Sequence, residues 1–297
     1  MFRKCVYIIA FAGVVMCAAN DVFAQKKQSQ EMLGNAYLEC QYAYSYAQDT
    51  LHLDTRKEDR MLLLIGKAAS KFYSYTTAMA DSAQKADFAK NLSHDQILAN
   101  RSKYSGGVSE LIYKNNESLF TIDKLVKDYF RVDEPLPDFG WVVADDDTIN
   151  ILGYPSRKAT CRFRGRSYIA WFTTAIAISN GPWKFSGLPG LIMKIQDTAN
   201  HYNWEIVGIK NVTDSAIALE NRQYIQTTRE KFSKMTKRFK EDPFAYMESV
   251  GIKVTVTGPS GKPMSSSELK KTKVTVALGD SVTSIGDLKG GYDPIER

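Results

Sequence analysis

The segment at residues 181–192, GPWKFSGLPGLI, constrains the fold of this chain more than any other stretch. It holds three glycines, two prolines and two aromatic residues. Glycine permits positive φ, proline fixes φ, and large aromatic side chains anchor a turn to a core. The segment therefore predicts a shaped turn rather than a linker, and we expect Gly190 in particular to adopt positive φ.

The first 24 residues have the organisation of an export signal. Arg3 and Lys4 form a basic head, residues 6–19 are mostly apolar, and a small residue, Ala24, precedes Gln25. We expect signal peptidase to cleave between Ala24 and Gln25. The product is then exported and lies in the periplasm or in association with an outer membrane.

Few cysteines remain after such cleavage. A lipoprotein signal lipidated at Cys17 is an alternative, although Met16 stands where that signal needs a small residue. In the mature chain Cys40 and Cys161 are left, and they either form a disulfide or are buried, unpaired thiols. They form no Cys-x-x-Cys motif and no cluster with metal-ligand spacing, so we expect neither a metal nor a cofactor.

Length and charge limit the organisation of the chain and its partners. The chain has 297 residues and a net charge of +6, and its basic and acidic residues interleave, which argues against nucleic acid as a partner. We expect a signal peptide at 1–24, one domain at 25–250 and a loop-rich tail at 251–297. After the signal, no stretch reaches the ~18 apolar residues of a transmembrane helix.

Between the signal and residue 219, alternating apolar and aromatic runs predict a series of strands. Because these strands are close in sequence, we expect them to pair antiparallel. We expect residues 38–47 to form an edge or near-edge strand. The triplet Asp145, Asp146 and Asp147 suits a solvated hairpin turn better than a calcium loop, because no distal glutamate completes such a loop. The expected strands are 38–47, 61–65, 71–77, 109–114, 118–132, 141–143, 157–163, 167–178, 191–196, 202–209 and 216–219.

Two segments predict helices. Residues 79–102 are rich in alanine and lysine, and residues 226–248 place Phe232, Met235 and Phe239 on one face, with a break at Pro243. The predicted fold is α+β: a curved antiparallel sheet or incomplete, bowl-like β-barrel with one or two covering helices.

Several motifs in a fixed order resemble the bacterial GLPGLI family. They are ILGY at 151–154, FRGR at 163–166, AWFT at 170–173, GLPGLI at 187–192 and the ending YDPIE at 292–296. The resemblance implies an exported protein of Gram-negative bacteria without an established activity. It also implies a distant similarity to the bowl-shaped N-terminal domain of some bacterial peptide N-glycosidases, whose catalytic part has no counterpart here. Many relatives have cysteine where this chain has Ser156, so no family disulfide is carried over.

The candidate binding residues lie in or beside three of these motifs, FRGR, AWFT and GLPGLI. Arg164 and Arg166 either grip an anionic group or face water at a hairpin tip. The aromatic residues either line an apolar binding face on a concave sheet or anchor the core. The candidates are Arg164, Arg166, Trp171, Trp183, Phe185, Gly187, Leu188, Pro189 and Gly190.

The sequence contains no catalytic constellation, because Ser186 is not in a nucleophile elbow and no histidine stands beside a nucleophile. We therefore expect a non-enzymatic protein that binds an apolar or peptide ligand, or an outer-membrane partner, through a concave sheet. This predicts an exposed apolar cavity near Trp171 and Trp183. The alternatives are a structural envelope subunit and a hydrolase of envelope glycans or peptides, in which carboxylates such as Glu205 and Asp197 converge in a cleft.

Overall fold

The computed structural model describes residues 7–9, 31–47, 56–101, 103–104, 107–252, 274–278, 281–285 and 295. The predicted signal peptide at 1–24 lies outside the described residues except for the strand β1 (Tyr7–Ile9). The cleavage site after Ala24 is therefore not described.

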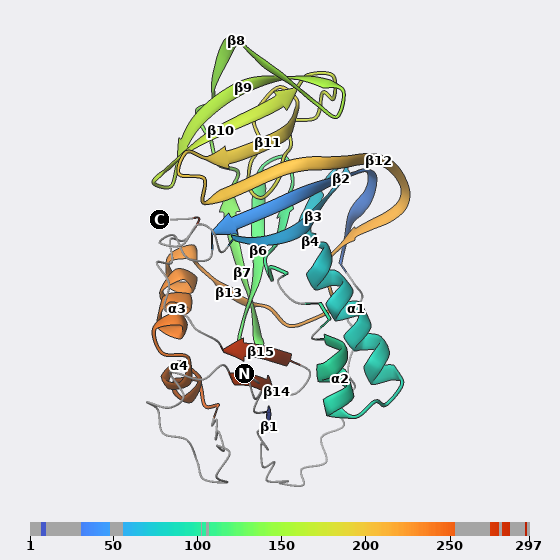
Figure 1. Cartoon of the computed structure of the whole chain (residues 1–297), viewed down its shortest axis with the longest axis vertical. Coiled ribbons are helices and arrows are strands. Elements are labelled where there is room, and N and C mark those ends of the chain that lie inside the picture. The colour runs from blue at the N-terminus through green and yellow to red at the C-terminus, as the bar shows by residue number, and fades with distance from the viewer. Residues whose placement is uncertain are drawn as a thin grey trace, which may run out of the picture. The chain divides into compact units, whose positions relative to one another are not determined.

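Strands dominate the structure (Figure 1). Twelve of them form one open sheet in the order β13-β7-β6-β5-β4-β3-β2-β12-β11-β10-β9-β8, and β1, β14 and β15 form a second, three-stranded sheet. The predicted class, an antiparallel sheet that is incomplete rather than closed, with few helices, is confirmed. The remaining strands are β2 (Met32–Ala47), β3 (Arg56–Gly66), β4 (Ser70–Ser74), β5 (Leu111–Lys114), β6 (Ser118–Leu125), β7 (Asp128–Pro135), β8 (Val142–Ile151), β9 (Tyr154–Phe163), β10 (Arg166–Thr173), β11 (Leu191–Asp197), β12 (Tyr202–Ala218), β13 (Ile225–Thr227), β14 (Val274–Leu278) and β15 (Ser281–Ile285).

The strand β2 lies in the middle of the large sheet, so the prediction of an edge strand at residues 38–47 is wrong. Tyr42 stands opposite Met61 of β3 on one side and Ile206 of β12 on the other. The two segments predicted at 202–209 and 216–219 join into the single 17-residue strand β12. This strand pairs with β2 along most of its length, although the two are far apart in sequence.

The acidic triplet lies within β8 and does not form the predicted hairpin turn. Val143 pairs with Ala159 and Thr148 with Arg157, so residues 144–147 bulge out of the pairing with β9. The turn lies instead at Leu152 and Gly153, whose φ angles are +52° and +86°. Two positive φ values are what the tightest hairpin turns require.

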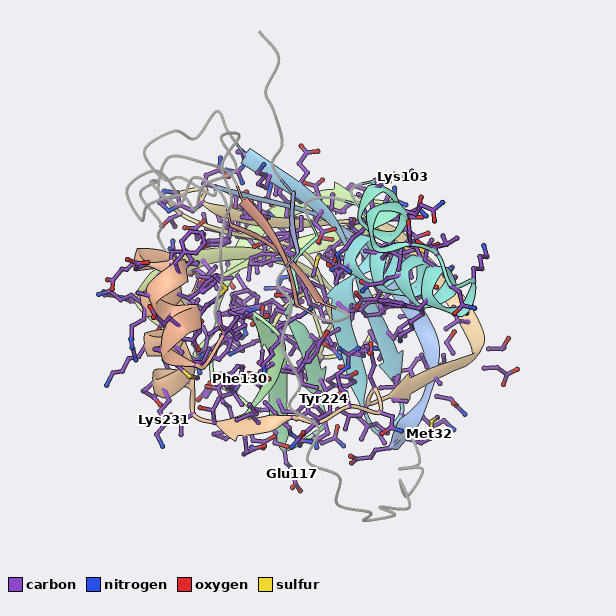
Figure 2. The ribbon with its side chains drawn as sticks, turned by 90° about the horizontal axis from the view of Figure 1, so that it is seen from below. Met32, Lys103, Glu117, Phe130, Tyr224 and Lys231 are labelled. Carbon is purple, nitrogen blue, oxygen red and sulfur yellow. The ribbon has the colours of Figure 1, made fainter. Side chains whose placement is uncertain are left out.

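The two predicted helical segments are four helices, and only the second division was predicted. The first predicted helix is two helices, α1 (Tyr75–Ala89) and α2 (His94–Arg101), and the hydroxyl of Ser74 caps α1, which ends the preceding strand early. The second is α3 (Arg229–Glu241) and α4 (Pro243–Ser249), divided before Pro243 as predicted. Side chains project outward all along α3 in Figure 2.

The chain divides into two compact units, each with its own core. One comprises the described residues of 31–123, 131–220 and 290–297, and the other those of 1–30, 124–130 and 221–289. The core of the first is rich in aromatic residues, and that of the second contains Phe130 and Met247. The predicted boundary at residue 250 stays a prediction, while β14 and β15 lie inside the predicted tail.

Candidate functional site

The segment at 181–192 is part of the core of the first unit. Trp183, Phe185 and Leu188 are at most 2% exposed. The ring of Phe185 lies 5.1 Å from that of Trp183 and 4.9 Å from that of Tyr168. These three candidate binding residues are therefore core residues, and Trp183 does not line an exposed apolar cavity as predicted.

Gly190 is required for a reason other than the predicted one. Positive φ occurs at Trp183 (+50°) and at the exposed Gly187 (+91°) but not at Gly190, so that prediction is wrong. A Cβ at Gly190 would overlap the carbonyl oxygen of Thr173 and lie 2.7 Å from its carbonyl carbon. Glycine is needed here because two backbones approach closely. Pro189, beside it, is exposed.

A buried lysine that the sequence did not single out fixes this segment. The ammonium of Lys114, on β5, donates hydrogen bonds to the carbonyls of Gly181 at 2.8 Å and Phe185 at 3.1 Å. No carboxylate pairs with it in the described part of the chain. Burial without a counter-charge lowers the pKa of Lys114 from 10.5 to about 7.

Two further side chains hold the same segment. The hydroxyl of Tyr42 donates to the carbonyl of Ile192 at 2.7 Å, and the indole nitrogen of Trp141 donates to that of Ser186 at 2.8 Å. Backbone groups of the segment are thus bound by side chains from separate elements. This arrangement gives the segment an architectural role.

Arg164 belongs to a three-residue ionic cluster. Glu134 accepts from Arg164 at 2.5 Å and from the buried Lys184 at 2.8 Å. Burial alone would raise the pKa of Glu134, but the charges and hydrogen bonds of Lys184 and Arg164 outweigh it and lower the pKa. Arg164 therefore has a carboxylate of its own, and it neither faces water freely nor awaits an anion.

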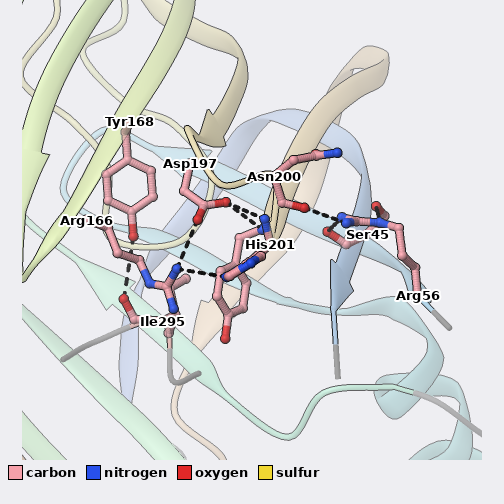
Figure 3. Close-up of polar contacts among 9 residues, drawn as sticks. Ser45, Arg56, Arg166, Tyr168, Asp197, Asn200, His201 and Ile295 are labelled. Carbon is pink, nitrogen blue, oxygen red and sulfur yellow. Dashed lines mark hydrogen bonds and ion pairs between the residues drawn. The ribbon is translucent and has the colours of Figure 1, made fainter. Parts of the chain in front are cut away.

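Arg166 forms a buried ion pair with Asp197 (Figure 3). The side chains are each 2% exposed, and the guanidinium lies 2.9 Å from the carboxylate. The second oxygen of Asp197 accepts from the backbone N–H groups of His201 at 2.7 Å and Tyr202 at 2.8 Å. The pair closes the hairpin between β11 and β12, so Asp197 is engaged in structure. The reading of Arg166 as an outward-facing or anion-gripping residue is wrong, because its partner is internal.

The two carboxylates named for a hydrolase lie on opposite faces of the sheet. Asp197 pairs with the core residue Tyr168, whereas Glu205 follows the core residue Trp204 and so points the other way. Glu205 forms an ion pair with Lys194 at 2.7 Å. The pair therefore cannot converge in one cleft. The described residues also contain no group of three or more acidic, histidine or cysteine side chains that could hold a metal ion.

One candidate lies on the face of the sheet that points away from the core. Register places Lys158, Trp171, Lys194 and Glu205 in one row across β9 to β12. Trp171 is half-buried, and the ammonium of Lys194 lies 5.8 Å above its ring. Ile169 of the neighbouring row is also half-buried. We call these five residues, four in one row and Ile169 beside it, the outer row.

Both cysteines are buried and unpaired. Burial raises the pKa of the Cys40 and Cys161 thiols to about 12, and at Cys40 the neighbouring Glu39 adds to the effect. Of the two readings left open by the sequence, the structure has the free thiols.

The chain is similar in sequence to a family of unknown function and distantly similar in structure to a known protein. Residues 158–194 match a family model described as "Protein of unknown function (Porph_ging)", and this stretch contains the GLPGLI hexapeptide. The match confirms similarity to an uncharacterised family, under this name rather than GLPGLI. No curated protein matches the chain.

Two crystal structures of PNGF-II, in space groups P21 and C2, are similar to this chain. The TM-scores are 0.45 and 0.46, the identities 12% and 13%, and the matches cover 67% and 68% of this chain. They cover 32% and 33% of the PNGF-II chains, so this chain spans about a third of their length. This is the predicted distant similarity to a peptide N-glycosidase, and it carries no functional argument. No helix in the described residues could cross a membrane.

Proposed function

We propose that the protein is a non-enzymatic, exported module of the cell envelope that binds a peptide or an outer-membrane protein through the outer row. Trp171 carries this proposal. Tryptophan is enriched among the residues that dominate binding energy at protein interfaces. Trp183 and Trp204 are core residues, whereas Trp171 stands on the other face of the sheet, among charged side chains of both signs.

The immediate surroundings of Trp171 support a protein or peptide partner. The ion pair of Lys194 and Glu205 beside Trp171 gives a polar border around an aromatic centre, which is the anatomy of a protein interface. An apolar ligand at Trp183 and Phe185 is not favoured, because both side chains are buried in the core.

The state of the charged residues supports a non-enzymatic role. Asp197 and Glu134, the partly or fully buried carboxylates near the family motifs, are each held by a cation. Neither is available as a general acid or base without breaking an ion pair that stabilises the fold.

Site-specific photo-crosslinking in the native envelope tests the proposal. A benzophenone amino acid is placed at Trp171 and, as a matched control, at the exposed Lys90 after α1. The proposal predicts one discrete adduct from position 171 and none from position 90. The same adducts from both positions, or none from either, would overturn it.

A further inference from the structure

The exposed side of α3 concentrates positive charge that the proposed function does not use. The helix contains six lysines and arginines and two glutamates, so its 13 residues carry a net charge of +4. Each glutamate is already engaged: Glu230 lies 2.9 Å from Arg229, and Glu241 lies 3.9 Å from Lys237.

Three of the cations share one stripe of the helix. Lys231, Lys234 and Arg238 stand at positions i, i+3 and i+7, which lie above one another on an α-helix and span about 10 Å. All three residues are exposed. None forms an ion pair within the described residues. Figure 2 shows Lys231 pointing away from the helix.

The apolar side of α3 is already occupied within its own unit. Phe232, Met235 and Phe239 pack against the second core. The ring of Phe130 lies 5.3 Å from that of Phe232, and the ring of Tyr246 lies 5.7 Å from that of Phe239. A free amphipathic helix inserts such residues among lipid acyl chains. In α3 they are partly buried against the second core, so the exposed side of the helix presents mainly charge.

We propose that the stripe of Lys231, Lys234 and Arg238 docks on an anionic lipid surface through the headgroup phosphates. A convex helix face cannot enclose a small ligand, whereas a flat array of phosphates meets all three cations at once. Each lysine or arginine near such a surface contributes about fivefold in affinity, so the stripe contributes on the order of 100-fold. Because no apolar side chain inserts, the binding is electrostatic and weakens with salt.

Co-sedimentation of the full chain with vesicles tests this docking. One set contains equal parts of phosphatidylglycerol and phosphatidylcholine, and the other contains phosphatidylcholine alone. The proposal predicts binding to the first set at low salt, its loss as salt rises, and little binding to the second. Equal binding to both sets, or binding that salt does not weaken, would overturn the proposal.

A matched pair of variants locates the surface. Changing Lys231, Lys234 and Arg238 to Gln removes three charges from the stripe and keeps good helix formers. The control changes the exposed Lys57, Lys67 and Lys90 to Gln, which alters the net charge equally. We expect the first variant to lose on the order of 100-fold in vesicle affinity and the control to lose little. Equal losses in both would contradict a specific stripe, as would binding to a soluble polyphosphate but not to vesicles. The wild-type comparison of the two vesicle sets stands even if a variant fails to fold.

Discussion

At the scale of single residues, Gly190 shows how close backbone approach fixes an amino acid. Its neighbour in space is the carbonyl of Thr173, which leaves no room for a side chain. We predict that Gly190→Ala destabilises the fold by about 3 kcal/mol or more, and that Gly190→Val prevents folding. Urea unfolding measures the first, and solubility with circular dichroism the second.

Gly208 provides the control for this prediction. A Cβ there would meet no atom closer than 3.7 Å, and its φ is not positive. Gly208→Ala is therefore expected to change stability by less than about 1 kcal/mol. If both alanine variants unfold at the same urea concentration, the close approach at Gly190 is not what the segment depends on.

Because burial lowers the pKa of Lys114, we expect the stability of the fold to depend on pH. Its pKa is about 7 in the folded protein and is 10.5 ordinarily, so between these values the unfolded chain binds a proton that the folded chain does not. Stability therefore rises with pH across this window, and the full cost of the buried charge is present below pH 7. From pH 7 to 8.5 we expect Lys114 to contribute a rise of about 1.5 kcal/mol.

The comparison with Lys114→Met isolates this contribution. Other groups that titrate in the same range cancel in the difference between the two proteins. Urea unfolding at several pH values should show a steeper rise in the wild type than in the variant. Parallel pH profiles would mean that Lys114 does not titrate as a buried, uncompensated amine.

At the scale of elements, the bulge in β8 lies on the last strand of an open sheet. Such an edge is a template for pairing with another chain, and charges and bulges are devices that prevent it. We predict that replacing Asp145, Asp146 and Asp147 by Thr causes self-association, which sedimentation velocity over a range of concentrations would detect.

The control for the β8 variant removes the same number of charges elsewhere. Glu31, Glu58 and Glu117 are exposed and are changed to Gln. This variant should remain as soluble as the wild type. Equal association of the two variants would indicate a general effect of net charge rather than protection of the edge.

Local signals explain which elements could be predicted from the sequence. The end of α3 and the start of α4 follow from Pro243, and the buried side of α3 follows from the spacing of Phe232, Met235 and Phe239. The prediction of a hairpin turn at the acidic triplet was wrong because the turn preference of aspartate is local, whereas the register of β8 on β9 is set by pairing across strands.

Long-range contacts explain what could not be predicted. The central position of β2 depends on its pairing with β12, and no local sequence feature of either strand indicates which strand it pairs with. Lys114 lies 67 and 71 positions from the carbonyls that it binds, so nothing near it in the sequence indicates its role. The same holds for Arg166 and Glu134, whose partners come from other elements.

At the scale of the whole molecule, the two cysteines report on global unfolding. Burial and the raised pKa of the Cys40 and Cys161 thiols keep them protonated and covered at pH 8. We expect iodoacetamide to leave both unlabelled in the native protein and to label both in urea, as read by mass spectrometry of their peptides. Recovery of one disulfide-linked peptide from non-reduced protein would show that the thiols pair.

In this molecule, the segment at 181–192 belongs to the core, whereas we propose that Trp171 binds a partner. Native mass spectrometry of the wild type and of Trp171→Ala, both purified from the native cell envelope, distinguishes these two roles. We expect a stoichiometric peptide or protein adduct on the wild type. We expect no adduct on the variant, which should retain the low charge states of a folded chain. Equal adducts on both proteins, or no adduct on either, would show that Trp171 is not the binding residue.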